Sequence, residues 1–347
     1  MNAVTNSAPK GKARLYACGG ASINIVSGIG AMQINPDLLA DLLITQIDTS
    51  PSNLTTRSTS VENYLMTIAG KVDGGGKNRT ENEALIEEHV KPILKMHPPG
   101  DVNIVISTGG GSSGSVIATK LTNELLIRGE CVIVLLIGTT GSRIEAKNSI
   151  DTQTNYEQIA KARNAPAVMV YMQNSQTMPR EKVNDHMRST IMYLAMLFSR
   201  RNSGLDSMDL RNWLYFTRPE VIKGLTPQLF SLTVLLREHT PEGEAKFEKE
   251  LDQLGNILSV ATLARIGGQT EMPEDFMPEY HTEGFAPDIK DSKVFDTQSV
   301  NFVISDGLVQ GFVTELRKFA KREKPQINTS TLLADSEDDD DAPTVNF

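Results

Sequence analysis

The residues best suited to chemistry form a glycine- and serine-rich segment between a predicted strand and a predicted helix. The apolar run Val102–Ile106 leads into the segment, and apolar residues recur at helical spacing from Val116 to Leu125. Glycine lets backbone N–H groups approach a ligand, and a helix N-terminus adds unpaired N–H groups and partial positive charge. The segment therefore predicts a site for nucleotide phosphates, with a flexible turn as the alternative. Its candidate binding residues are Gly109, Gly110, Gly111, Ser112, Ser113 and Gly114.

The elements around this segment predict a doubly wound α/β domain with a parallel sheet. Continuous apolar runs, typical of strands buried on both faces, alternate with helical patterns. The runs are Arg14–Cys18, Leu42–Asp48, Val102–Ser107, Cys131–Gly138 and Ala167–Met172. Helices are predicted over Gly20–Ile29, Ser60–Ala69, Asn82–Met96 and, as one long connecting helix, Pro179–Arg201.

The second half of the chain has a different pattern and predicts a smaller α+β domain. Strands are expected at Leu229–Arg237, Ile257–Ile266 and Val300–Ser305, with a helix over Glu242–Leu254, a loop over Gly267–Lys293 and a final helix over Asp306–Lys324. The predicted division is an N-terminal arm (1–12), a nucleotide domain (13–179), a central helix (180–203), a second domain (204–325) and a disordered acidic tail (326–347).

Composition limits the class of protein. The 347 residues carry a net charge of −9, and the segment Asp335–Asp341 alone holds six acidic side chains. The rest is near neutral, so we expect no direct nucleic-acid binding. No apolar run is long enough to span a membrane, and two cysteines in apolar runs indicate buried free thiols in the cytoplasm. A Rossmann-type enzyme stays open as an alternative, although the glycine segment has neither Walker nor Rossmann spacing.

The glycine segment resembles the tubulin signature loop, whose usual form is Gly-Gly-Gly-Thr-Gly-Ser-Gly. Two further segments are similar to loops of the tubulin and FtsZ superfamily. The first comprises Gly19, Gly20, Ala21 and Asn24, which the resemblance places at the nucleotide, with an ordinary glycine turn as the alternative. The other comprises Gly74, Gly75 and Gly76, which resemble the loop that senses the γ-phosphate, with a flexible linker as the alternative.

The same resemblance assigns side chains to the ribose and the base. Glu145 stands where the family has a ribose-binding glutamate, although Ser149 replaces the usual arginine four residues later. Asn174, Asn184 and Asp185 match positions that read the guanine edge. An amide and a carboxylate can pair with the N1–H, 2-amino and O6 groups of guanine. Asp48 ends its strand, where a carboxylate can hold a sugar hydroxyl or a metal-bound water, or cap a turn.

After the long helix, the segment Gly204–Trp213 resembles the loop that completes the active site of the neighbouring subunit. That loop reads Asn-x-Asp-x-x-Asp in the family, and Ser207, Asp209 and Asn212 take these positions here, with Asp206 additional. The resemblance implies Asp209 and Asp206 as catalytic residues. The alternative is a turn with an aspartate capping the next helix.

The resemblance implies a GTPase that binds GTP or GDP with Mg²⁺ and polymerises head to tail. The final helix and acidic tail look most like the tubulin-like proteins of large bacteriophages, which position phage material in the host cytoplasm. In those proteins the acidic tail docks on the next subunit, and a cargo or adaptor protein is a further expected partner. The alternatives are a non-hydrolysing GTP-binding scaffold or regulator, and a plasmid-segregation or cell-division relative.

Overall fold

The computed structural model describes residues 9–32, 36–54, 61–66, 83–139, 141–175, 177–200, 206–215, 228–238, 240–264, 279–281 and 299–306. The predicted loop at 73–79, nearly all of the predicted final helix and the acidic tail lie outside this set. None of the described helices is long and apolar enough to cross a membrane.

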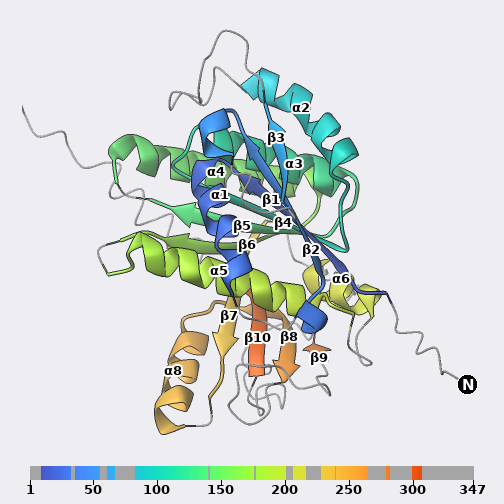
Figure 1. Cartoon of the computed structure of the whole chain (residues 1–347). Coiled ribbons are helices and arrows are strands. Elements are labelled where there is room, and N and C mark those ends of the chain that lie inside the picture. Colours follow the sequence, from blue (N-terminus) through green and yellow to red (C-terminus); the bar gives the residue numbers. More distant parts are fainter. Residues whose placement is uncertain are drawn as a thin grey trace, which may run out of the picture.

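The described strands form one sheet in the order β3-β2-β1-β4-β5-β6-β7-β10-β8-β9 (Figure 1). The pairs from β3 to β7 are parallel, and the remaining pairs are antiparallel. The strands are β1 (Lys12–Cys18), β2 (Asp41–Asp48), β3 (Val61–Leu65), β4 (Val102–Thr108), β5 (Val132–Gly138), β6 (Ala167–Gln173), β7 (Leu229–Leu236), β8 (Ile257–Ala264), β9 (Glu279–His281) and β10 (Ser299–Ser305).

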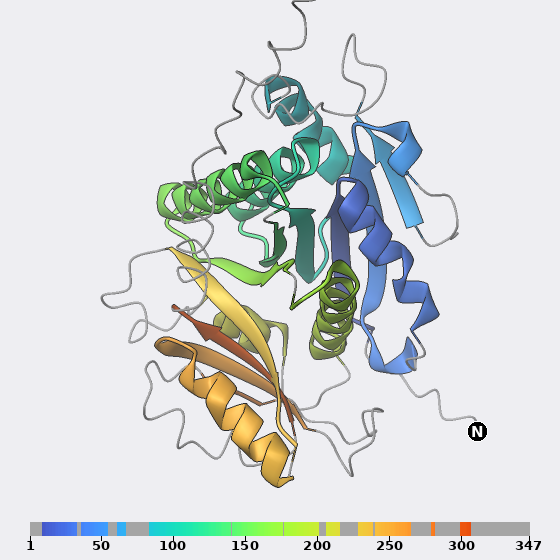
Figure 2. The same cartoon turned by 90° about the vertical axis from the view of Figure 1, so that its left-hand side faces the viewer.

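Helices cover both faces of the parallel part, which confirms the predicted doubly wound fold (Figure 2). Helices α1 (Gly20–Ser27) and α5 (Arg180–Leu197) lie on one face. Helices α2 (Glu83–Met96), α3 (Ser113–Ile127) and α4 (Arg143–Arg163) cover the other. The short 3₁₀ turns are η1 (Ile29–Ala31), η2 (Pro36–Leu38) and η3 (Pro51–Asn53).

The long helix α5 joins the two halves through a shared core. Its buried side chains pack with residues of β1, β4 and α1 and also with residues of β7, β8 and β10. Helix α6 (Ser207–Tyr215) contributes the fully buried Trp213, whose ring lies 6.4 Å from that of Phe198 and 6.2 Å from that of Phe302. Helix α8 (Pro241–Asp252) packs on the outer part through Phe247 and Leu251. The smaller α+β part is therefore confirmed in its described elements.

Two local predictions were wrong. Part of the segment Ser60–Ala69 is the strand β3 rather than a helix, because β2 offers a free parallel edge that tertiary pairing uses despite the helix-like spacing of Val61, Tyr64 and Leu65. Within the predicted loop Gly267–Lys293, residues Glu279–His281 form β9 by pairing with β8.

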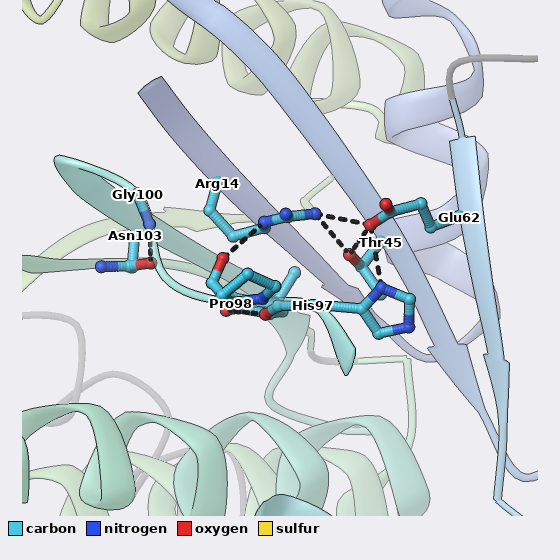
Figure 3. A network of polar contacts seen from close by, with 8 residues as sticks. Arg14, Thr45, Glu62, His97, Pro98, Gly100 and Asn103 are labelled. Carbon is cyan, nitrogen blue, oxygen red and sulfur yellow. Dashed lines mark hydrogen bonds and ion pairs between the residues drawn. The ribbon is translucent and has the colours of Figure 1, made fainter. Parts of the chain in front are cut away.

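A polar network anchors β3 to the sheet (Figure 3). The Glu62 carboxylate accepts hydrogen bonds from Arg14 Nη1 at 2.6 Å and Thr45 Oγ1 at 3.2 Å, and contacts His97 Nδ1 at 2.8 Å. The Arg14 side chain is nearly buried, at 4% exposed, and Glu62 is the charge partner of its guanidinium. Burial acts to raise the pKa of Glu62, but hydrogen bonds from His97 and Arg14 outweigh it and lower the pKa overall.

We expect Glu62→Gln to lower the free energy of unfolding by about 1–2 kcal/mol at pH 7, since it leaves the Arg14 guanidinium without its counter-charge. Because the folded pKa is below the ordinary value, the stabilisation by Glu62 is complete above that value and is lost as pH falls through the lowered pKa. Urea unfolding at pH 7 and at lower pH measures both effects. Glu87→Gln is the control, since its exposed pair with Lys120 contributes little. An equal loss in both variants would contradict the network's role.

Candidate functional site

The first glycine loop turns the chain from β1 into α1. Gly19 has a φ of 85°, which glycine adopts without strain, and its N–H donates to Ile47 O at 2.9 Å. The backbone N–H groups of Gly20, Ala21 and Ser22 donate to no described residue, as the first turn of a helix leaves them. The Ser22 hydroxyl is buried, also without a hydrogen-bond partner in the described part of the chain. The loop thus presents unpaired donors.

The second loop, 109–114, has its carbonyls bonded to the protein and most of its N–H groups unpaired. The carbonyls of the three glycines accept side-chain hydrogen bonds, from Thr152 Oγ1 at 3.1 Å, Asn148 Nδ2 at 3.3 Å and Ser115 Oγ at 2.6 Å respectively. The N–H groups that find no acceptor among the described residues are those of Gly110, Ser112, Ser113 and Gly114. This polarity suits an anion.

The two loops touch each other. A Cβ placed on Gly114 would lie 2.6 Å from the carbonyl oxygen of Cys18, and one on Gly19 would lie 3.0 Å from Gly114 Cα. The loop after β2 joins them, since Thr49 Oγ1 lies 2.9 Å from Ser113 Oγ. The carboxyl ends of β1, β2 and β4 therefore converge on one place, which is where open parallel sheets bind ligands.

Asp48 belongs to this place as a structural residue. Its side chain accepts hydrogen bonds from Thr49 N at 2.7 Å, Ser50 N at 3.2 Å and Asn53 Nδ2 at 2.9 Å. Burial raises its pKa although these three bonds oppose the shift. The amide of Asn53 in turn lies against Gly20. The turn-capping alternative thus accounts for the contacts of Asp48.

Glu145 lies against the second loop. It is the third residue of α4, and its N–H donates to the N-cap hydroxyl of Ser142 at 3.2 Å. A Cβ on Gly110 would lie 3.0 Å from Glu145 Cβ, and one on Gly109 would lie 3.0 Å from Ser149 Cα. The first turn of α4 therefore borders the glycine loop on the β5 side.

The amide and carboxylate residues predicted to read a base lie at the next strand end and at the start of α5. Asn174 N donates to Gly138 O at 3.1 Å, and Asn174 Oδ1 is buried without a hydrogen-bond partner among the described residues. Asn184 is 8% exposed, whereas the Asp185 side chain is 70% exposed. Exposed Asn24 lies on α1, which packs against α5.

Arg188 connects Asp185 to helix α1 and was missed by the sequence analysis. Its guanidinium contacts Asp185 at 2.7 Å and the backbone carbonyls of Asn24 and Ile25 at 3.4 and 3.0 Å. The available signal was an arginine three residues after Asp185 on the same helix, which places the two side chains on one face.

Asp206 and Asp209 form a reciprocal cap at the start of α6. Asp206 Oδ1 accepts from Met208 N at 2.7 Å and Asp209 N at 2.9 Å, while Asp209 Oδ2 accepts from Asp206 N at 3.0 Å. The backbone N–H groups of Asp209 and Met208 lower the pKa of the exposed Asp206. Asn212 lies one turn further into the helix.

Helix α6 lies at the opposite end of the parallel sheet from the glycine loops (Figure 1). Arg211 Nη2 donates to Gly129 O at 2.8 Å, and the Tyr215 hydroxyl contacts Glu130 O and accepts from Val132 N at 2.9 Å. These contacts are at the start of β5, and the seven-residue strand runs from there to the glycine loops, a length of roughly 20 Å. The structure does not bring Asp206 and Asp209 to the other predicted site residues within one chain.

The described residues fit a nucleotide better than a protein-held metal. Unpaired N–H groups on two touching loops suit phosphates, and the buried Asn174 Oδ1 lacks the donor that a base would supply. Within the described ranges, no three His, Cys, Asp or Glu side chains group as metal ligands. The predicted residues Gly74, Gly75 and Gly76 lie outside the described residues.

Comparison with known proteins gives consistent results. No family model matches the chain. The phage tubulin-like protein of Pseudomonas phage PhiPA3 is 33% identical over 225 residues, or 65% of this chain and 67% of the relative. The phage tubulin-like protein of Pseudomonas phage phiKZ is 29% identical over 229 residues, which are 63% of this chain and 68% of that relative.

Solved structures agree over most of the chain. A protofilament of TubZ from bacteriophage PhiKZ has a TM-score of 0.69 and 25% identity, covering 91% of this chain and 94% of that one. The phage tubulin PhuZ with GDP has a TM-score of 0.67 at 23% identity, covering 92% and 96%, which shows the shared fold. This chain therefore belongs to the phage tubulin-like proteins of the tubulin and FtsZ superfamily.

Proposed function

We propose that this protein binds GTP at the loops after β1, β4, β5 and β6, and hydrolyses it when subunits stack head to tail. The main supporting observation is the separation of two half-sites. Unpaired N–H groups lie at one end of the parallel sheet, and the paired carboxylates of Asp206 and Asp209 lie at the other. One chain cannot bring these halves together, whereas two stacked copies can.

In this proposal the two touching glycine loops hold the phosphates, together with Gly74, Gly75 and Gly76. Glu145 binds the ribose, and Asn24, Asn174, Asn184 and Asp185 surround the base. Mg²⁺, bound mainly by phosphate oxygens and water, would neutralise charge as the terminal phosphate leaves. Asp48 supports the loops through Asn53 and the turn that it caps.

The proposed catalytic role of Asp206 and Asp209 is to orient the attacking water on the GTP of the next subunit. When the family pattern Asn-x-Asp-x-x-Asp is aligned three residues closer to the N-terminus, its two aspartates fall on Asp206 and Asp209. These two residues lie within one turn at the start of α6. Reciprocal capping fixes both carboxylates on a rigid element, with Asp206 exposed and Asp209 half-buried.

The distribution of exposed apolar side chains supports a head-to-tail contact. The six large exposed ones among the described residues all lie at or near the ends of strands and helices. They are Leu65, Met96, Ile127, Ile144, Met178 and Met208. Met208 lies between the two aspartates, and Ile144 lies beside Glu145. A contact between unlike ends of identical subunits builds an open filament rather than a closed dimer.

The solved structures of relatives include a protofilament and a complex with GDP, which motivates the same function here. We further propose that the filament positions phage cargo, directly or through an adaptor, in the host cytoplasm. A non-hydrolysing GTP-binding scaffold is the second candidate, since the glycine segment departs from the usual signature loop.

Turnover measured against protein concentration tests the proposal. We expect phosphate release per subunit to rise steeply above a critical concentration, because each active site needs two subunits, and GTP-dependent sedimentation to begin at the same concentration. Turnover per subunit that is independent of concentration would contradict catalysis at an interface. Sedimentation with GTP but no phosphate release would support the scaffold.

We propose that the acidic tail docks on the neighbouring subunit of the filament. The six carboxylates in Asp335–Asp341 repel one another and need a cationic partner. We expect deletion of residues 335–347 to raise the critical concentration about tenfold while GTP affinity of the monomer is unchanged, and added salt to weaken wild-type filaments. Unchanged assembly at low salt would indicate a tail that only aids solubility.

A further inference from the structure

The guanidinium of Arg188 divides its hydrogen bonds between two helices. Nε donates to Ile25 O at 3.0 Å and Nη2 to Asn24 O at 3.4 Å, both on α1. Nη1 donates to Asp185 Oδ1 at 2.7 Å on α5, its own helix. The Arg188 side chain is 21% exposed, so solvent screens these contacts only in part.

Two features of α1 make it a receptor for this group. The accepting carbonyls belong to its last turn, where the helix dipole gives carbonyls a partial negative charge. Each also accepts one local hydrogen bond, Ile25 O from Gly28 N at 3.2 Å and Asn24 O from Ser27 Oγ at 2.9 Å, so Arg188 is the second donor to each. The last turn of α1 holds no basic residue, so Arg188 supplies the charge from another helix. The planar guanidinium fork of arginine can donate to both carbonyls and to a carboxylate at once, whereas the ammonium of lysine acts as a point charge.

Gly28 leaves the space that the guanidinium occupies. A Cβ on Gly28 would lie 2.5 Å from Arg188 Nε and 2.7 Å from its Cζ. The obstructed atoms are the far end of a flexible side chain, and the backbone of Gly28 has φ −86° and ψ −9°, which alanine adopts readily. A methyl group at position 28 should therefore displace the guanidinium while the fold persists.

We infer that Arg188 is a positioning residue for guanine recognition. Asn24 and Asp185 are contributed by different helices, and Arg188 fixes both the approach of α1 to α5 and the orientation of the exposed Asp185 carboxylate. The carboxylate is the group suited to the 2-amino group of guanine. The inference rests on the proposed GTP binding and identifies the residue that sets the preference of the site for guanine.

The test compares GTP with inosine triphosphate, which lacks the 2-amino group, by titration below the critical concentration. We expect Arg188→Ala to weaken GTP binding about tenfold and inosine triphosphate binding much less, so that the preference for GTP collapses. Gly28→Ala should have the same effect with Arg188 still present. Arg188→Lys should recover little, because it cannot form the fork.

Two control variants accompany these measurements. Gly30→Ala adds the same methyl group where nothing lies within 4 Å. Lys182→Ala removes an exposed cation from the same helix. Both should keep the preference and the melting temperature of the wild type. Equal losses for the two nucleotides, or an unchanged preference in Arg188→Ala and Gly28→Ala, would overturn the positioning role of Arg188 but leave the proposed GTP binding intact. A wild-type chain without preference for GTP would contradict the proposed guanine reading as well.

Discussion

Asp209→Asn should keep GTP binding and reduce filament-dependent hydrolysis by about 100-fold or more, as expected for loss of a group that handles the attacking water. Asparagine retains an oxygen that can accept from Asp206 N, which Asp209 now does at 3.0 Å, so the cap of α6 survives. Filaments should last longer, because GTP in the lattice is not consumed. Phosphate release and light scattering measure both effects, and Asp206→Asn should behave similarly.

The controls separate catalysis from folding. Thr240→Ala removes the cap of α8, where Thr240 Oγ1 accepts from Gly243 N at 3.0 Å, and should lower stability by about 1 kcal/mol without reducing turnover per filament. Mixing Asp209→Asn with a subunit that cannot bind GTP should restore turnover, since the second subunit lends its intact Asp209. Absence of rescue in filaments that contain both subunits would argue against catalysis in trans.

Gly114→Val should abolish GTP binding, with a loss of at least about 100-fold in affinity. A branched side chain at this position meets the backbone of Cys18, whose carbonyl oxygen would lie 2.6 Å from the new Cβ, and no side chain can move aside to relieve the contact. The first turn of α3 must then shift away from the first loop. The unpaired N–H groups of the two loops no longer converge on one phosphate chain.

Gly111→Ala is the matched substitution in the same loop. A Cβ there would lie 3.1 Å from Thr108 Oγ1, a side-chain atom that can adjust, and the N–H of Gly111 already has an acceptor in Thr108 O at 3.4 Å. We expect a loss of less than about fivefold. Titration with a fluorescent GTP analogue and melting temperatures compare the two. Similar losses for both variants would mean that the contact between the loops is not what organises the site.

The approach of Arg188 to Asn24 and Ile25 on α1 and the capping role of Asp48 have a common physical origin. Each depends on hydrogen bonds that the tertiary structure allows. Those of Arg188 join residues more than 150 positions apart, and those of Asp48 lie within a turn whose shape the neighbouring strands impose. A sequence pattern reports spacing along one element. It carries no information on which helix packs beside it.

Local patterns along the chain were enough to predict the alternation of buried strands and helices, and therefore the position of the glycine loops. Continuous apolar runs such as Val102–Ile106 must be covered on both faces, and parallel strands place every following loop at one edge of the sheet. The long helix was equally determined, because Val183, Met187, Ile191 and Leu194 repeat at helical spacing and all four are buried.

Other features depend on packing between segments that are distant along the chain. The segment Val61–Leu65 forms a strand because it pairs with the free edge of β2 and because Glu62 contacts Arg14 and His97. Asp206 and Asp209 lie far from the glycine loops because α5, about 27 Å long, carries the chain from one end of the sheet to the other. Local patterns fix what each segment forms, whereas the distance between two half-sites depends on how the segments pack.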